Sequence, residues 1–145
     1  MTVSNDVRVV LGSWGELNEP AAAIRFEVFV EEQQVPLEEE LDVMDEQCLH
    51  ALAYNLTHVP IATGRLLPDG HIGRMAVLKP YRQAGAGSAV LVALMDAALK
   101  KGLTEVVLGA QLHARNFYAK HGFIEYGDVF LDANIEHVMM KRSLL

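Results

Sequence analysis

The order of apolar and polar residues changes period several times along the chain, and each change marks a predicted element. Short apolar runs bounded by turn residues are typical of strands, whereas apolar residues spaced three and four apart are typical of helices. Strands are predicted at residues 7–11, 49–56, 61–67, 71–78, 105–110, 123–130 and 135–141. Helices are predicted from Glu19-Pro20 to about Val30, at 86–101 and at 112–121.

Turn residues join these segments in an order that indicates the fold class. Pro68-Asp69-Gly70 predicts a tight turn between the strands at 61–67 and 71–78. Gly102 and Gly122 stand where a glycine commonly ends a helix. Strands come first and then alternate with helices, which predicts an α/β protein with a central mixed sheet and helices on both faces. We expect residues 1–145 to form a single domain, because no repeat or second pattern interrupts this order.

Length, charge and cysteine count exclude several classes of function. A chain of 145 residues can bury a core of its own. A net charge of −7 disfavours nucleic acid as a partner, and no apolar run is long enough to span a membrane. The first six residues lack the features of a secretory signal, and the one cysteine, Cys48, fits a reducing compartment. We therefore expect a cytoplasmic protein, and the histidine spacing predicts no metal site.

A glycine-rich segment between the strand at 72–78 and the next helix carries the clearest chemical signal. It reads R-x-x-G-x-G, with Arg82, Gly85 and Gly87. Free N–H groups and the helix dipole at a helix N-terminus favour an anion, and glycine lets a phosphate approach the main chain. A pyrophosphate cradle is predicted from Gln83, Ala84, Gly85, Ala86, Gly87 and Ser88. Arg82 either adds a charge-assisted contact or stays a solvated surface residue.

Two other phosphate-binding loops do not match this segment. A nucleotide P-loop needs a lysine directly before Ser88, and none is present. A dinucleotide-binding turn needs a third glycine where Val90 stands, and its ribose-binding acid should end the next strand, whereas Glu105 begins one. For the G-x-G pattern alone, ordinary turn chemistry stays open.

The segment resembles the coenzyme A loop of the GCN5-related N-acetyltransferases, the GNAT superfamily. A second motif, Asn116-x-Tyr118 before Gly122-Phe123, resembles the other signature of that superfamily, and it follows at the distance that a helix, a strand and a helix start require. A narrower resemblance to the ElaA/YjcF-like branch covers nearly the whole chain. It rests on segments 25–36, 38–42, 72–77, 110–111 and 135–137, with Asp45 and His50.

The resemblance implies a GNAT fold and an acyl-CoA co-substrate. In this fold a twisted, mostly antiparallel sheet contains two parallel central strands that splay apart, here 72–78 and 105–110, and acetyl-CoA enters the gap. By resemblance, main-chain groups of Met75, Ala76 and Val77 polarise the thioester carbonyl and pair with the pantetheine arm. The resemblance also allows a homodimer, and it leaves the acceptor open.

Acetyl transfer to an amine needs an acid for the departing thiolate and a base for the ammonium. Tyr118 is the predicted acid, with packing on the sheet as its alternative. Asn116 either contacts coenzyme A or caps locally. His137 is the predicted base because imidazole titrates in the useful range, and a half-buried histidine bonded to the main chain is its alternative. Glu40, Asp45 and His113 are further candidates for the base.

Arg25, Arg65 and Arg74 are the predicted acceptor-binding residues. An arginine on a mostly apolar strand is costly to bury without an anionic partner. The acidic, irregular stretch 31–46, predicted as a loop or short helix facing the site, offers Glu38, Asp42 and Asp45 as internal partners, so structural ion pairing stays open.

The prediction for function is an acetyl-CoA-dependent N-acetyltransferase that acts by direct attack in a ternary complex. A small-molecule amine is the first choice of acceptor and a peptide the second. An acyl-homoserine-lactone synthase is one alternative, because Arg25, Phe29, Asp42, Asp45 and Arg65 resemble its pattern, although Pro36 and Leu37 stand where a tryptophan is usual. A non-catalytic acyl-CoA-binding module is the other, and Tyr118 argues against it.

Overall fold

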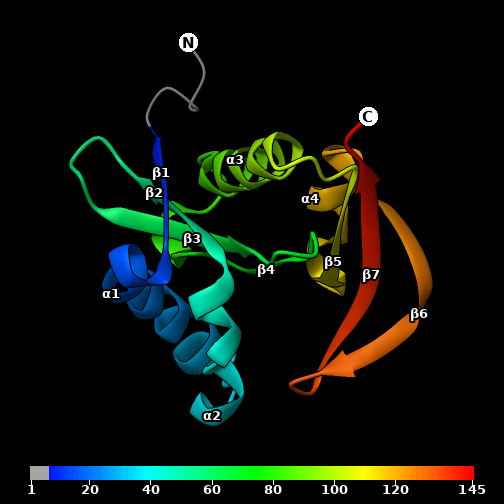
Figure 1. Cartoon of the computed structure of the whole chain (residues 1–145). Helices are drawn as coiled ribbons and strands as arrows, with labels where there is room; N and C mark the ends of the chain where they lie inside the picture. Colours follow the sequence, from blue (N-terminus) through cyan, green and yellow to red (C-terminus); the bar gives the residue numbers. More distant parts are fainter. Residues whose placement is uncertain (1–6) are drawn as a thin grey trace.

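The structure is a computed structural model that describes residues 7–145 (Figure 1). Met1 to Asp6, on which the exclusion of a secretory signal rests, lie outside the described residues. The strands are β1 (Arg8–Gly12), β2 (Leu49–Tyr54), β3 (Pro60–Leu66), β4 (Ile72–Val77), β5 (Glu105–Gln111), β6 (Ile124–Asp132) and β7 (Ile135–Ser143). The α-helices are α1 (Trp14–Arg25), α2 (Leu37–Glu40), α3 (Ala86–Lys100) and α4 (Arg115–Lys120). A π-helical segment, η2 (Phe26–Glu32), and the single turns η3 (Val43–Gln47), η4 (Lys79–Tyr81) and η5 (Leu112–Ala114) complete the described elements.

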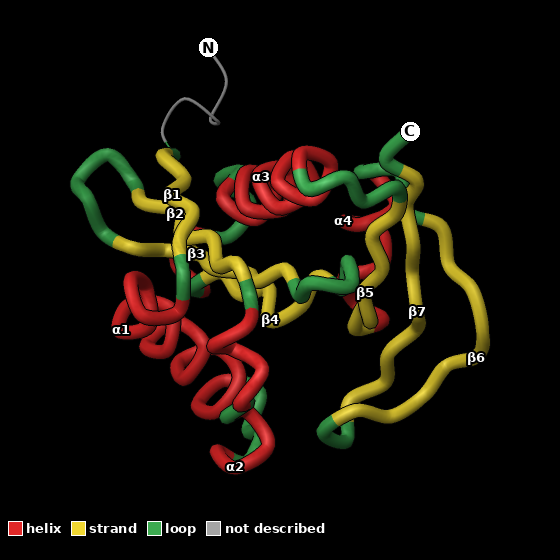
Figure 2. Tube along the Cα trace, viewed as in Figure 1, coloured by secondary structure: helices red, strands yellow, loops and turns green. Residues whose placement is uncertain are grey.

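The strands form two antiparallel sheets that meet along β4 and β5. One sheet has the order β1-β2-β3-β4 and the other has the order β5-β7-β6. Between them, the described residues show one isolated parallel bridge, His71 with Val107, supported by a 3.1 Å hydrogen bond from the Val107 N–H to the Gly70 carbonyl. The parallel strands thus touch near their starts and separate toward their ends (Figure 2). This confirms the predicted GNAT fold with its splayed central strands.

Helices cover both faces of the four-stranded sheet, as the element order predicted (Figure 1). The main core packs α3 against β2, β3, β5 and β7, and a smaller cluster packs α1 against the opposite face. Gly64 in β3 allows the close approach of α3, because a Cβ there would lie 2.9 Å from Val90 Cγ1 and 2.6 Å from Met75 Sδ. Burial of this core holds both sheets in place around the gap.

Some element boundaries differ from the prediction. Helix α1 begins at Trp14, well before Glu19-Pro20, because Ser13 and Glu16 form a capping box that the apolar pattern did not reveal. The predicted helix at 112–121 is a single turn, η5, followed by the short α4. Strand β6 continues to Asp132, further than predicted, because Ala133 and Asn134 both adopt positive φ (51° and 65°) and close the hairpin in two residues. Strand β7 continues beyond its predicted end to Ser143, which pairs with Glu105 of β5.

Candidate active site

A cleft of about 1080 Å³ lies where β4 and β5 diverge. Its walls come from η2, β4, the glycine-rich segment, β5, α4 and β7. The cleft is large enough for a cofactor-sized ligand together with a small second substrate. The predicted donor-binding residues Met75, Ala76, Val77, Arg82, Gln83, Gly85, Ala86, Gly87 and Ser88 all line it, and Ala84 is the loop residue that does not.

Strand β4 carries a bulge at the centre of the cleft. Thr63 pairs with Ala76 and Arg65 pairs with Gly73, so Arg74 and Met75 together oppose the single residue Gly64. A bulge leaves main-chain groups of the strand without partners in the sheet and re-aims its side chains. This geometry supports the prediction that N–H groups near Met75 face a bound carbonyl.

The glycine-rich segment forms a concave turn that opens toward the cleft. Gln83 and Gly85 have positive φ (66° and 88°), and Gly85 is the N-cap of α3. Among the described residues, no main-chain carbonyl accepts from the N–H groups of 83–88, because the first such bond of the helix comes from Ala89 to Gly85. Neighbouring N–H groups in this conformation form an anion site. A Cβ at Gly87 would meet only ordinary contacts, at 3.4 Å from Val77, so packing alone does not require glycine there.

Arg82 is paired with a glutamate that the sequence did not suggest. Its guanidinium donates to both carboxylate oxygens of Glu32 at 2.7 and 2.6 Å, and its Nε donates to the Val77 carbonyl at 2.9 Å. The hydrogen bonds from Arg82 hold the pKa of Glu32 below its usual value. Because the pair is half exposed, a pyrophosphate in the cradle can compete with Glu32 for Arg82.

Ser88 and His121 form a second contact at the donor end of the cleft. Ser88 Oγ lies 2.9 Å from His121 Nε2. Burial, assisted by the nearby charge of Arg142, lowers the pKa of His121. The imidazole is therefore neutral at pH 7 and is placed to orient the serine hydroxyl beside the N-terminus of α3.

Tyr118 lies in α4 with its ring packed edge-on against Phe117 and Phe123. Its side chain is buried and lines the cleft. The hydroxyl has no hydrogen-bond partner among the described residues, yet it is not one of the polar atoms sealed from solvent, so it faces the cleft. Burial raises the pKa of Tyr118 to about 12, so the phenol stays protonated at neutral pH.

His137 lies on β7, next to the open end of β5. Its Nδ1 is 2.7 Å from the Ile135 carbonyl, which can only accept, so Nδ1 carries the proton and Nε2 keeps a free lone pair. The ring stacks on Phe130 and lines the cleft. This tautomer is the one that a base in the cleft requires.

The other candidates for the base differ in position. Asp45 does not line the cleft, and although burial opposes it, the arginines Arg25 and Arg65 hold the pKa of Asp45 below its usual value. Glu40 lines the cleft but accepts a 2.5 Å hydrogen bond from Arg25. His113 lines the cleft as well. His137 and His113 are thus the candidates without a carboxylate or guanidinium partner within the described residues.

The three predicted acceptor arginines belong to one arginine network, made of Arg25, Arg65, Arg74, Glu40, Asp42 and Asp45. Arg25 is 2% exposed and its guanidinium donates to Glu40 and Asp45, while Arg65 bridges Asp42 and Asp45. Neither Arg25 nor Arg65 lines the cleft. The structure therefore favours structural ion pairing, the alternative to acceptor binding, for these two arginines. Glu38, offered as a partner, is exposed, and Glu40 takes its place. Arg74 does line the cleft.

A reciprocal amide pair joins the two walls of the cleft. Gln111 Nε2 donates to Gln33 Oε1 at 2.9 Å, and Gln33 Nε2 lies 3.3 Å from Gln111 Oε1. Gln33 follows η2, and Gln111 ends β5 beside His137, its partner on β7. No spacing in the sequence indicated this contact, because the two residues are far apart in the chain.

Several residues lie away from the cleft. Asn116 is exposed and makes no hydrogen bond with its side chain among the described residues, so its predicted contact with coenzyme A stays a prediction. Cys48 is buried and donates to the Met44 carbonyl, which fits a core residue. No cluster of metal-ligating side chains and no helix able to cross a membrane occurs within residues 7–145.

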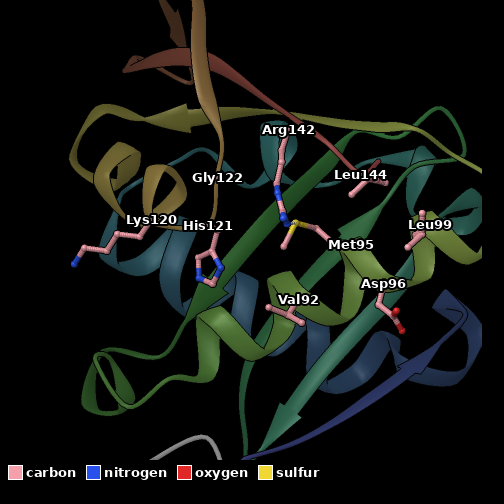
Figure 3. A pocket seen from close by; sticks show the side chains of 9 residues that line it. All are labelled: Val92, Met95, Asp96, Leu99, Lys120, His121, Gly122, Arg142 and Leu144. Carbon is pink, nitrogen blue, oxygen red and sulfur yellow. Dashed lines mark hydrogen bonds between the residues drawn. The ribbon is translucent and has the colours of Figure 1, made fainter.

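A second hollow, of about 590 Å³, lies between α3 and the end of β7 (Figure 3). Arg142 points across it toward Met95 and donates to the Met95 sulfur at 3.2 Å. Asp96 on its rim is paired with Lys100. His121 lines both hollows, but Tyr118, His137 and the residues of the glycine-rich segment do not line this one.

The chain is similar in sequence and fold to known proteins. The model of the acetyltransferase (GNAT) domain matches residues 16–144. The uncharacterized N-acetyltransferase YjcF of Bacillus subtilis is 37% identical over 141 residues, which cover 94% of this chain and 100% of YjcF. The crystal structure of a putative N-acetyltransferase from Lactobacillus plantarum superposes with a TM-score of 0.88 at 30% identity, covering 97% of this chain and 100% of the other. Escherichia coli ElaA superposes with a TM-score of 0.82 at 27% identity, covering 93% and 99%.

Proposed function

The chain belongs to the GNAT acetyltransferase family, in the branch of YjcF and ElaA, and we propose that it acetylates a small-molecule amine with acetyl-CoA. One observation carries the proposal. The anion-binding turn at 83–88, the bulge at Arg74–Met75, the Tyr118 hydroxyl and the Nε2 atom of His137 all open into one cleft. These are the groups that hold a donor, polarise its carbonyl and move the protons.

The donor fits the chemistry of the residues present. The free N–H groups of 83–88 would hold the pyrophosphate of acetyl-CoA, and Arg82 would exchange Glu32 for it. The unpaired main chain of the β4 bulge would face the thioester carbonyl. Acetyl-CoA supplies the activated acetyl group, and these residues orient it toward the acceptor side of the cleft.

Two side chains that line the cleft, His137 on β7 and Tyr118 on α4, would carry out the proton transfers. His137, with Nδ1 fixed on the Ile135 carbonyl, accepts a proton from the acceptor ammonium at Nε2, directly or through water. The amine nitrogen then forms the new bond to the acetyl carbon, the C–S bond breaks, and the nitrogen releases its remaining extra proton to solvent water. Tyr118 donates its phenolic proton to the leaving sulfur and is afterwards reprotonated from solvent. Its raised pKa keeps the phenol protonated at neutral pH and also makes it a weaker proton donor than an exposed tyrosine.

The walls of the cleft favour a small acceptor over a peptide. The Gln33–Gln111 pair bridges the cleft from the end of η2 to β5, and such a bridge would leave less room for an extended chain than for a small molecule. An acyl-homoserine-lactone synthase stays the second candidate, because Arg25, Asp45 and Arg65 of its pattern are present in the arginine network, whereas Pro36 and Leu37 in place of the usual tryptophan favour the acetyltransferase. The free Tyr118 hydroxyl and the prepared tautomer of His137 favour catalysis over passive binding of acyl-CoA.

Calorimetric titration with acetyl-CoA tests the donor site. We expect stoichiometric, micromolar binding that Gly87→Glu abolishes, because the new carboxylate would enter the anion site. Gly15→Glu is the matched control. This substitution adds the same charge, and Gly15 lies in the first turn of α1, away from the cleft. Acetyl-CoA that fails to bind the wild-type protein would overturn the proposal. Binding would be followed by an amine screen that measures thiol release.

A further inference from the structure

Arg74 is the member of the arginine network that reaches the cleft. Its side chain is 26% exposed, compared with 2% for Arg25 and 8% for Arg65. Both of the sealed arginines make short hydrogen bonds to carboxylates, so their role in holding α1, η3 and β3 together accounts for them. Arg74 differs from them in position, in partners and in backbone conformation.

The carboxylates of the network are engaged by the other two arginines. Glu40 Oε1 accepts from Arg25, Asp42 Oδ2 accepts from Arg65, and Asp45 accepts from both. Arg74 comes no nearer to a carboxylate oxygen than 3.6 Å at Asp42 and 3.7 Å at Glu40, which is beyond hydrogen-bond length. Its hydrogen bonds go to the main-chain carbonyls of Glu40 at 3.2 Å and, weakly, Glu39 at 3.5 Å.

Arg74 therefore has no hydrogen-bonded carboxylate, although Glu40 and Asp42 lie 3.7 and 3.6 Å from its guanidinium. Its Nε is shut off from solvent and has no hydrogen-bond partner among the described residues. Burial lowers the pKa of Arg74, and the charges of Arg65 and Arg25 lower it further, against the smaller effects of Glu40 and Asp42. A carboxylate in the cleft would supply the hydrogen-bonded anion that the network does not give to Arg74.

The backbone at Arg74 is held in a costly conformation that directs the side chain. Its φ is 50°, in the left-handed region that non-glycine residues rarely occupy. Gly73 stands directly before it, with open space around its Cα, and could take that conformation at lower cost. The bulge opposite Gly64 places the strained residue at the cleft instead. Strained residues of this kind cluster at binding and active sites, so the conformation of Arg74 suggests a role in binding.

We propose that Arg74 binds a carboxylate of the acceptor, so that the acceptor is an amino acid or a related amine that carries a carboxylate. This inference rests on the proposed function. Nη1 of Arg74 makes no hydrogen bond within the described residues and is not sealed from solvent, so a carboxylate in the cleft can accept from it, and the planar guanidinium suits that group. The network is neutral, with three arginines and three carboxylates, and Glu39 also lines the cleft. That balance accommodates the single charge of a carboxylate better than the double charge of a phosphate.

The test compares each proteinogenic amino acid with its own carboxamide as acceptor, with acetyl-CoA as donor and thiol release as the signal. We expect kcat/KM for at least one acid to exceed that of its amide by about tenfold or more, as for a lost hydrogen bond to a charged group. Arg74→Gly should lower this acid-to-amide ratio by about tenfold, because glycine tolerates the φ of 50° while the guanidinium is removed. Arg74→Lys keeps the positive charge but lacks the planar guanidinium, so its acid-to-amide ratio should lie between those of the wild type and Arg74→Gly. Arg115→Gln, at a surface arginine, should leave the ratio unchanged.

A second measurement does not depend on turnover. Free amino acids, added to the protein in the presence of coenzyme A, should raise the unfolding temperature more than their carboxamides do, and Arg74→Gly should remove the difference. Equal shifts from acids and amides, no shift from any acid, or equal turnover of both would overturn the inference. Failure of acetyl-CoA to bind would instead overturn the proposed function. Binding of acetyl-CoA with turnover of carboxylate-free amines alone would overturn the inference and leave the proposed function standing.

Discussion

The proposed donor half of the cleft is built from main-chain groups of one short segment, whereas the proposed acceptor half is built from side chains of several distant segments. Residues 83–88 offer free N–H groups that any sequence with the right glycines could present. The acceptor half depends on Arg74 and on the network that Arg25, Glu40, Asp45 and Arg65 form behind it. Main-chain recognition suits a donor shared by a whole family, and side-chain recognition suits an acceptor that differs between members.

The two halves also differ in how much they contribute to the stability of the fold. The donor turn is half exposed and its Arg82–Glu32 pair is open to solvent. The network of the acceptor half is buried and joins α1, α2, η3, β3 and β4. Substitutions in the donor half should therefore change ligand binding, whereas substitutions behind the acceptor half should first change stability.

The largest effect is expected from Arg25→Leu. It leaves Glu40 buried without its hydrogen-bonded cation and leaves Asp45 with Arg65 alone, and the loss of one partner of a buried ion pair costs about 3–5 kcal/mol of unfolding free energy. The melting temperature should fall by about 10–20 °C, which differential scanning calorimetry measures. Arg115→Leu is the matched control, because its only carboxylate contact among the described residues is an exposed one at 4.0 Å. Equal melting temperatures for the two variants would show that the network does not hold the fold.

Tyr118→Phe should lower kcat by about 10²-fold while it leaves the affinity for acetyl-CoA unchanged. The hydroxyl is the one atom removed, and it makes no hydrogen bond within the described residues, so stability should not fall. With its pKa raised to about 12, the tyrosine loses its proton only at very high pH. The wild-type rate should therefore show no decline from tyrosine ionisation below about pH 11. Full turnover by the variant would exclude Tyr118 as the acid.

His137→Asn should lower kcat/KM by about tenfold or more, because the variant has no base to accept the proton of the acceptor. Asparagine can still donate to the Ile135 carbonyl but offers no basic nitrogen at the position of Nε2. His113→Asn is the matched comparison on the same cleft and should keep most of the wild-type kcat/KM. A large loss in the His113 variant and none in the His137 variant would transfer the role of base to His113.

The smallest effects are expected at the exposed pair Arg82–Glu32. Arg82→Gln should weaken acetyl-CoA binding about threefold, and Glu32→Gln should tighten it by a similar factor because it frees the guanidinium. Both changes should shrink as salt is added. Calorimetry at low and high salt measures them, and opposite signs in the two variants are the decisive result. A loss of affinity in both would mean that the ion pair supports the cradle rather than competes with the ligand.

The amino-acid sequence determined the order of the elements and the donor half of the cleft. The periods of the apolar residues place β2, β3, β4, β5 and α3 close to their observed bounds. Arg82, Gly85 and Gly87 lie within a few residues of one another, so their local geometry follows from chain chemistry and can be read directly. The capping box at Ser13 and Glu16 is also a local signal, because its S-x-x-E spacing marks the start of α1.

The tertiary structure alone decided which side chains face the cleft. Arg25, Arg65 and Arg74 are indistinguishable by residue type, and only packing seals the first two while the bulge at β4 exposes the third. The pairs Gln33–Gln111 and Arg82–Glu32 join residues from different halves of the chain. Such contacts depend on how the two sheets diverge and on what η2 packs against, and these follow from burial of the whole core rather than from any local pattern.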